Sequence, residues 1–131
     1  MKKIFLLLML FASSYAMSQT PYKVFCEILG TGKLLSTKVS VTVDFGQKTS
    51  IYNTYKQKLV DDNGKSIEFN SMVDAMNYMA KSGWVFEQAY YVTVSGQNVI
   101  HWLLSKEVMS DEEIKDGFIT KQEYEKINKK D

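Results

Sequence analysis

Arginine is absent from this chain of 131 residues, because all 16 of its basic residues are lysines. Cysteine, histidine and proline each occur once, as Cys26, His101 and Pro21. A single cysteine excludes an internal disulfide, and one cysteine with one histidine excludes zinc sites built from three such ligands. With 15 acidic residues the formal charge is only +1, so the chain lacks the basic surface that binds nucleic acids, and we expect no such partner.

The remaining composition is that of a globular protein. Hydrophobic residues make up 45% of the chain and charged residues 24%, which excludes a disordered or collagen-like chain. The length predicts one compact domain.

The N-terminal segment 1–18 has the three regions of a secretory signal peptide. Lys2 and Lys3 precede an apolar run over residues 4–12, and small or polar residues follow. This run is far shorter than the ~20 residues that a membrane-spanning helix needs. We therefore predict that the protein is exported, either to the periplasm or out of the cell, with no transmembrane segment left after signal removal.

The cleavage site has two candidates. Small residues at the first and third positions before the cut permit cleavage after Ala16 or after Ser18, and we favour the second, which leaves Gln19 at the N-terminus. Removing residues 1–18 deletes two of the 16 lysines and none of the 15 acidic residues, so the exported chain carries a formal charge of −1.

Two early segments have the two-residue periodicity of β-strands. In 22–29 the apolar positions alternate around Cys26, which predicts a buried and unreactive thiol. In 36–45 valines alternate with polar residues, which predicts an antiparallel sheet with one side in water. The intervening Gly30-Thr31-Gly32-Lys33 predicts a turn.

Two hairpins are expected further along. Asn63-Gly64 is the strongest short hairpin signal and would turn the chain within residues 58–69. Ser95-Gly96-Gln97 would join strands 84–94 and 98–108, the longest hairpin of the chain. Strict alternation along 84–94 would put Phe86, Gln88, Tyr90, Val92 and Val94 on one face and Val85, Glu87, Ala89, Tyr91 and Thr93 on the other.

A helix is predicted between these hairpins. Ser71 with Asp74 approximates a capping box, and Gly83 is a typical helix end. Its apolar stripe contains Met72, Met76 and Met79, flanked by Val73 and Ala80. A methionine stripe also occurs in copper sites and adaptable binding grooves, but we favour packing on the sheet because no histidine or cysteine accompanies it.

Residues 57–108 resemble a small bacterial family of unknown function. The resemblance rests on a helix, then Gly83 and Trp84, then a hairpin; family members continue with Glu-Leu-Val, where this chain has Val85 and Phe86. It implies a sheet with a helix on one face and no established activity.

The C-terminal decapeptide 116–125 resembles the SHOCT module, a short C-terminal domain of two helices. The matching positions are Gly117, Ile119, Thr120, Glu123, Tyr124 and Glu125. The residues themselves also predict two short helices in 110–131, since Ser110 with Glu113 and Thr120 with Glu123 form capping pairs. Helices this short are stable only when packed, and we favour a partner or self-association over the chain's own sheet.

Catalytic and metal-binding patterns are nearly absent, and we predict no catalytic residue, no metal and no cofactor. The segment around Gly117 imitates half of an EF-hand, but Ile114 would stand where calcium needs an oxygen ligand. A nucleophilic pair of Cys26 and His101 is conceivable, although nothing in their spacing supports it.

These observations predict an α+β fold: an antiparallel sheet of about four to six strands, one helix on one face, and a short C-terminal helical pair. The expected divisions are a signal peptide at 1–18, the α+β domain at 19–109 and the tail at 110–131. The favoured function is a non-enzymatic interaction or assembly module of the cell envelope, bound to another envelope protein or to itself. Its candidate interaction residues are Tyr91, Trp102, Phe118, Ile119 and Tyr124. The alternative is an enzyme or small-ligand binder with a pocket between the methionine-lined helix and the sheet.

Overall fold

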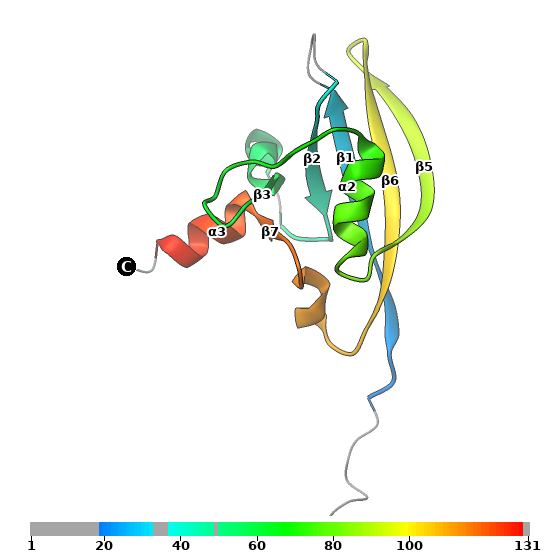
Figure 1. Cartoon of the computed structure of the whole chain (residues 1–131), viewed down its shortest axis with the longest axis vertical. Coiled ribbons are helices and arrows are strands. Elements are labelled where there is room, and N and C mark those ends of the chain that lie inside the picture. Colours follow the sequence, from blue (N-terminus) through cyan, green and yellow to red (C-terminus); the bar gives the residue numbers. More distant parts are fainter. Residues whose placement is uncertain (1–18, 33–36, 49, 130–131) are drawn as a thin grey trace, which may run out of the picture.

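A computed structural model describes residues 19–32, 37–48 and 50–129, and the predicted signal segment 1–18 lies outside them. The described residues form a five-stranded sheet, a helix on one face and a smaller C-terminal part (Figure 1). In chain order the elements are β1 (Tyr22–Gly32), β2 (Val39–Asp44), the 3-10 helix η2 (Ile51–Gln57), β3 (Leu59–Val60), β4 (Glu68–Phe69), α2 (Met72–Ala80), β5 (Val85–Val94), β6 (Gln97–Val108), the 3-10 helix η3 (Asp111–Lys115), β7 (Ile119–Thr120) and α3 (Lys121–Asn128).

The main sheet is antiparallel, with the strand order β4-β2-β1-β6-β5. β1 is its central strand, and the long β5–β6 hairpin forms one side, with β5 at the edge (Figure 1). A second, two-stranded sheet pairs β3 with β7. The predicted α+β class, the number of strands and the helix on one face are confirmed.

Gly30 has a different role from the predicted turn residue. β1 continues through Gly32, so the turn predicted at 30–33 is wrong for its first three residues, and Lys33 lies outside the described part. Gly30 faces the helix, where a β-carbon would collide with the sulfur of Met72. Gly30 leaves room within the strand for the Met72 side chain, and the chain does not turn there.

The start of α2 follows the predicted cap with one change. The Ser71 hydroxyl accepts the Asp74 N–H over 3.2 Å, as expected of an N-cap. The Asp74 carboxylate, however, accepts the N–H of Asn70 over 2.9 Å rather than that of Ser71. The reciprocal bond of a capping box is thus displaced by one residue.

The buried side of α2 consists of Met72, Ala75 and Met79, which are 6%, 0% and 0% exposed. Val73 is 59% exposed and Ala80 is exposed, so their expected place beside the apolar stripe is wrong. The buried face of α2 is therefore narrower than the apolar stripe predicted from the sequence.

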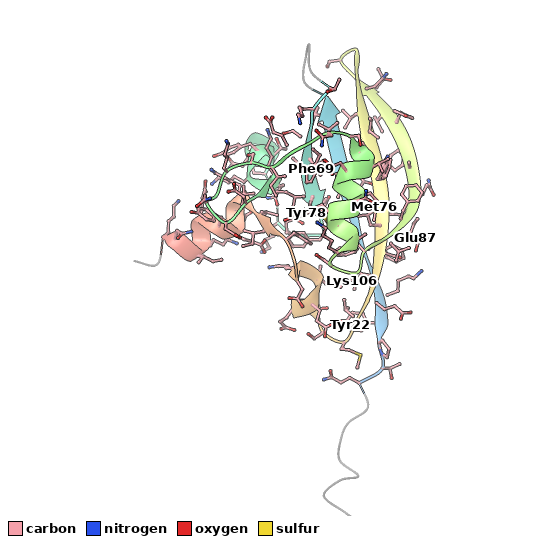
Figure 2. All side chains as sticks on the ribbon, in the orientation of Figure 1. Tyr22, Phe69, Met76, Tyr78, Glu87 and Lys106 are labelled. Atoms are coloured by element: carbon pink, nitrogen blue, oxygen red, sulfur yellow. The ribbon has the colours of Figure 1, made fainter. Side chains whose placement is uncertain are left out.

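The core lies between α2 and the sheet. Cys26 is 2% exposed within it, as predicted. Beside the helix, the rings of Phe69 and Tyr78 meet edge to face with centroids 5.5 Å apart (Figure 2). The buried residues of this cluster are Cys26, Ile28, Val41, Val43, Leu59, Phe69, Met72, Ala75, Met79, Trp84, Leu104 and Phe118.

The Asn63-Gly64 turn forms, but it does not join two strands of one sheet. The Gly64 N–H donates to the Asp61 carbonyl over 2.9 Å, and a single bridge joins Val60 to Ser66. β3 then pairs with β7, whereas β4 pairs with β2. Past the turn, the Asp61 N–H donates to the Lys65 carbonyl over 2.9 Å and the Ile67 N–H to the Leu59 carbonyl over 3.0 Å, so the predicted hairpin is confirmed over residues 59–67. It is wrong only at Glu68 and Phe69, which pair with β2 instead.

The C-terminal tail, residues 110–129 of the described chain, packs on its own domain. β7 pairs with β3, and Phe118 is 4% exposed in the core, with its ring 6.1 Å from that of Phe45. The capping box of Thr120 and Glu123 is present, as predicted. The expectation that a partner holds this tail is wrong, since these contacts come from the same chain. Of the two short helices expected in the tail, the first is the 3-10 helix η3 and the second is the α-helix α3.

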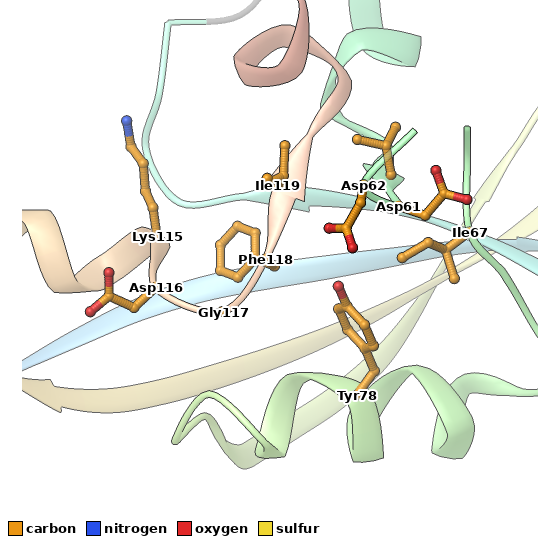
Figure 3. Close-up of a pocket in the computed structure, with 10 residues that line it drawn as sticks. Asp61, Asp62, Ile67, Tyr78, Lys115, Asp116, Gly117, Phe118 and Ile119 are labelled. Carbon is orange, nitrogen blue, oxygen red and sulfur yellow. The ribbon is translucent and has the colours of Figure 1, made fainter. Parts of the chain in front are cut away.

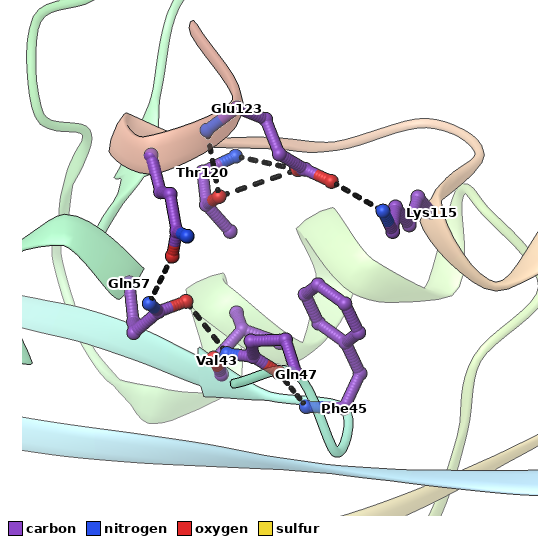
Figure 4. Close-up of polar contacts among 8 residues, drawn as sticks. Val43, Phe45, Gln47, Gln57, Lys115, Thr120 and Glu123 are labelled. Carbon is purple, nitrogen blue, oxygen red and sulfur yellow. Dashed lines mark hydrogen bonds and ion pairs between the residues drawn. The ribbon is translucent and has the colours of Figure 1, made fainter. Parts of the chain in front are cut away.

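Side-chain hydrogen bonds fasten the tail further (Figure 4). Gln47 donates to the Val43 carbonyl over 2.8 Å and to Gln57 over 2.6 Å, and Gln57 donates to Gln122 of α3 over 2.7 Å. Gln57 is only 6% exposed, so this chain of amides satisfies groups that burial would otherwise leave without partners.

Candidate interaction surface

The five predicted interaction residues do not form one surface. Tyr91 is 71% exposed and Trp102 is half-buried, and both lie on the β5–β6 hairpin. Ile119 and Tyr124 are half-buried in the tail. Phe118 is buried in the core, so its predicted place on an interaction surface is wrong. Its ring instead fills space beside β2 and its neighbours.

The edge strand β5 carries more exposed large apolar side chains than any other element of the described chain. Eleven large apolar side chains are exposed in the part of the chain that the structure describes, and five of them lie on this strand: Val85, Phe86, Tyr90, Tyr91 and Val92. β5 pairs only with β6 among the described strands. Along its outer side, an edge strand presents N–H and C=O groups without strand partners.

A β-bulge decides which face each side chain of β5 joins. Phe86 pairs with Leu104 and Gln88 pairs with the adjacent Leu103, so Glu87 is an extra residue. Because strict alternation takes no account of this residue, the faces predicted for the strand are wrong on one side of the bulge.

The bulge leaves apolar side chains exposed on both faces of the hairpin. On the helix side, Phe86 meets Trp102 with ring centroids 5.1 Å apart and an interplanar angle of 71°, and Tyr91 follows along the strand. The opposite side, which we call the open face, exposes Phe25, Val85, Tyr90 and Val92. Strict alternation predicts Phe86 and Tyr90 on the same face, whereas the structure has them on opposite faces.

A carboxylate, an imidazole and a phenol meet on the open face. Glu27 Oε1 lies 2.6 Å from His101 Nδ1, and Tyr90 Oη donates to Glu27 Oε2 over 2.6 Å. The rings of Tyr90 and His101 stack 4.8 Å apart. The hydrogen bond to Glu27 raises the pKa of Tyr90, and desolvation adds to this shift. Sequence analysis missed this cluster, because its members come from three strands whose register it could not assign.

The single charge on β5 is used within the sheet. Ser105 donates a hydrogen bond to the Glu87 carboxylate, and the Lys23 ammonium lies 3.1 Å from it. The bond from Ser105, followed by the contact with Lys23, lowers the pKa of Glu87. Glu87 lies at the β5 side of the sheet in Figure 2. Its charge is therefore engaged by β1 and β6.

Cys26 and His101 do not form a nucleophilic pair. Cys26 shares the helix side with Leu104, whereas His101 lies opposite Leu29 on the open face. Burial raises the pKa of the Cys26 thiol to about 12, with the charge of Asp44 as the next contribution. The thiol is thus held neutral and separated from the imidazole by the sheet, so the pair lacks both contact and activation.

A cavity of about 580 Å³ lies beside α2 (Figure 3). Tyr78 of the helix and Asp62 of the β3–β4 loop point toward one another, and Phe118 lies to one side of them in the lining (Figure 3). Burial and then the charge of Asp62 raise the pKa of Tyr78. The lining combines acidic groups with a neutral phenol and contains neither the histidine nor the cysteine of the chain.

The described residues contain no group of three or more His, Cys, Asp or Glu side chains that could hold a metal ion. Within the same residues, no helix is both long and apolar enough to cross a membrane. No family model, no curated protein and no solved structure matches the chain.

Proposed function

We propose that this protein is an exported interaction module of the cell envelope and that it binds a protein partner, either another envelope protein or a second copy of itself, through β5. The observation that carries the proposal is the concentration of exposed apolar side chains on one edge strand. Exposed apolar side chains concentrated on one element are a common mark of interaction sites, and an open strand edge adds backbone groups that an extended partner can pair with.

Export is proposed from the signal-peptide pattern of residues 1–18. The partner is therefore sought among proteins of the same compartment. Neither lipid nor nucleic acid is favoured, because the exposed residues of β5 carry no positive charge.

Binding is favoured over catalysis by the way α2 sits on the sheet. Met72, Ala75 and Met79 fill the helix–sheet interface, where the alternative function would need a pocket. The cavity beside Tyr78 lies instead between the helix, the β3–β4 loop and the tail. Neither the cysteine nor the histidine of the chain lines it, so the binding role has the stronger support.

The proposal is tested by photo-crosslinking in intact cells that export the protein. A photoreactive residue at Tyr91 on β5 is compared with one at Val73, which is 59% exposed on the outer side of α2. We expect a discrete protein adduct from position 91 and none from position 73.

Equal labelling from both positions, or no adduct from 91 in cells whose envelope contains the protein, would overturn the proposal. The mass of an adduct then identifies the class of partner, because a second copy gives twice the mass of the chain and any other protein gives a different increment.

A further inference from the structure

The turn of the β5–β6 hairpin fixes the direction of the backbone groups of β5. Ser95 and Gly96 form a two-residue loop with φ of 51° and 79°, and Val94 lies opposite Gln97. Two successive residues with positive φ define a type I′ turn, whose flanking residues form a hydrogen-bonded pair. Hydrogen-bonded and non-hydrogen-bonded pairs then alternate along the ladder.

This alternation identifies the residues that face outward. Val94, Val92 and Tyr90 direct their N–H and C=O groups toward β6. Thr93, Tyr91 and Ala89 therefore direct theirs away from the sheet, at regular two-residue intervals. These three residues supply the hydrogen-bonding groups of the open edge.

Beyond the bulge at Glu87, the outer edge of β5 lacks the charges and prolines by which exposed strands avoid pairing. The stretch Gln88–Val94 extends from the bulge to the turn and contains no charged residue, no proline and no glycine. Edge strands that must remain single usually carry lysine, proline or an inward charge. This one combines tyrosines with valines and threonine, which are strong strand formers.

We infer that this edge pairs antiparallel with the same edge of a second copy of the chain, so that two five-stranded sheets become one continuous sheet. The inference rests on the proposed function, since it identifies the partner of the same strand. Tyr91 lies on the two-fold axis and faces Tyr91 of the second copy.

The register follows from symmetry. Directly opposed side chains of two paired strands lie on the same face of the sheet, and residues on one face of a strand differ by an even number of positions. In a two-fold dimer of identical strands, opposed residues must therefore differ by an even number. The axis then passes through one residue and not between two. Tyr91 is the middle residue of Gln88–Val94, and its outward N–H and C=O groups make the central pair hydrogen-bonded. An axis at any other residue pairs part of the strand with the bulge or the turn.

The side chains are complementary in this register. Tyr90 lies opposite Val92 of the second copy, which is an aromatic–β-branched pair of the kind that stabilises sheets. Ala89 lies opposite Thr93, which leaves room beside the two central tyrosines. Tyr90, Tyr91 and Val92 are 39%, 71% and 38% exposed in the single chain, so pairing covers part of an apolar surface that is now open to water.

Charge favours the same arrangement. Glu87 is the only charged residue of β5, and the register separates it from its counterpart by eight residues along the strands. At ~3.4 Å per residue this is about 27 Å, well beyond the screening length of ~8 Å at physiological salt. Neutral, self-complementary edges can approach without like-charge repulsion, and this is the reason for naming a second copy as the occupant.

The contact is expected to be small. At ~200 Å² per aromatic side chain, the exposed fractions of Tyr90 and Tyr91 amount to about 200 Å² per copy, below the ~800 Å² per partner of standard interfaces. The dimer should therefore dissociate on dilution, and the test must cover a wide range of concentration.

Disulfide trapping of purified protein tests the register. The Tyr91→Cys chain should form a covalent dimer on mild oxidation, because opposed residues of a hydrogen-bonded pair have Cα atoms ~5.5 Å apart, within disulfide range. The Thr93→Cys chain is the matched control, since its two thiols would be four residues, or about 14 Å, apart. The unmodified chain, with buried Cys26, should not cross-link. Equal trapping at both positions, or faster trapping at 93, overturns the inference.

Sedimentation analysis from ~10 μM to ~1 mM, the range in which weak complexes form, tests the association itself. The unmodified chain should pass from monomer to dimer. Tyr91→Lys, which sets two ammonium groups face to face on the axis, should stay monomeric, whereas Val73→Lys on the outer side of α2 should dimerise like the unmodified chain. A chain that stays monomeric throughout overturns the inference. If position 91 nevertheless cross-links to a different protein in cells, the proposed function stands and only its self-pairing form fails.

Discussion

The C-terminal tail and the strand β5 have similar apolar and aromatic residues, but opposite environments. Phe118 of the tail is 4% exposed, whereas Tyr91 of β5 is 71% exposed. The difference comes from backbone pairing: β7 finds β3 as a partner, whereas β5 has β6 on one side and no strand among the described residues on the other. Whether an aromatic residue is structural or free to bind thus depends on where its backbone pairs.

Removal of residues 110–131 is the most severe test of this comparison. It deletes Phe118 and the partner of β3, and leaves Leu59 and Val60 without cover. We expect an unfolding free energy at least ~4 kcal/mol lower, since the buried Phe118 side chain and the pairing of β7 with β3 are both lost. Binding of a dye for exposed apolar surface should increase. A thermal melt with the midpoint of the full chain would mean that the tail is not part of the fold.

Two alanine substitutions, one in the tail and one on β5, compare how much each aromatic side chain contributes to the free energy of unfolding. Phe118→Ala should cost about 3–5 kcal/mol, because it empties a buried site. Tyr91→Ala should change the unfolding free energy by less than ~0.5 kcal/mol, because its side chain is in water. Urea unfolding of dilute samples gives both numbers, and similar costs at the two sites would remove the distinction between tail and edge.

Cys26 reports whether the core under α2 and the tail unfold together. Burial raises the pKa of its thiol to about 12, above the ordinary value of 9.0, so the folded state holds the proton more tightly than the unfolded state. The resulting stability is fully present below pH 9 and is lost as the pH rises toward 12, by about 1.4 kcal/mol between pH 8 and pH 10.

The pH dependence is measured as the difference between the unmodified chain and Cys26→Ala, which cancels the other groups that titrate there. Native labelling by a thiol reagent at pH 8 should also be slow, and should accelerate in the chain without residues 110–131 but not in Tyr91→Lys. Rapid labelling of the intact chain would contradict the burial of Cys26.

The smallest effect concerns the helix caps of the tail. Thr120→Ala removes an N-cap whose hydroxyl accepts the Glu123 N–H and should cost about 1 kcal/mol. Ser110→Ala is the control, because Ser110 makes no side-chain cap bond to η3 and should cost less than ~0.5 kcal/mol. Equal losses in urea unfolding would show that the Thr120 cap does not stabilise α3.

The sequence alone predicts the features that depend on near neighbours. The alternation around Cys26 correctly indicates a buried strand, and Thr120 with Glu123 correctly indicates a helix start. Features that depend on distant partners are missed. Gly30 reads as a turn because nothing in the sequence reveals that Met72 packs against it.

The candidate surface shows the same limit. Tyr91 is found from its strand, but its exposure depends on the absence of a neighbour, which no local pattern encodes. Because Glu87 is an extra residue in the strand, Phe86 and Tyr90 lie on opposite faces of the sheet, although they are four residues apart. Counting alternate residues along the sequence therefore assigns their faces wrongly. The Glu27–His101–Tyr90 cluster requires the register of three strands.

Amide hydrogen exchange followed residue by residue, in dilute and in concentrated samples, tests most directly whether β5 is an open edge that pairs. The dilute sample should exchange rapidly at Ala89, Tyr91 and Thr93, whose N–H groups point outward, and slowly at Tyr90 and Val92, which pair with β6. Concentration should protect the first three amides and leave the Lys121 amide, bonded to the Lys58 carbonyl over 2.9 Å, unchanged. Outward amides that exchange equally fast at both concentrations would contradict the account.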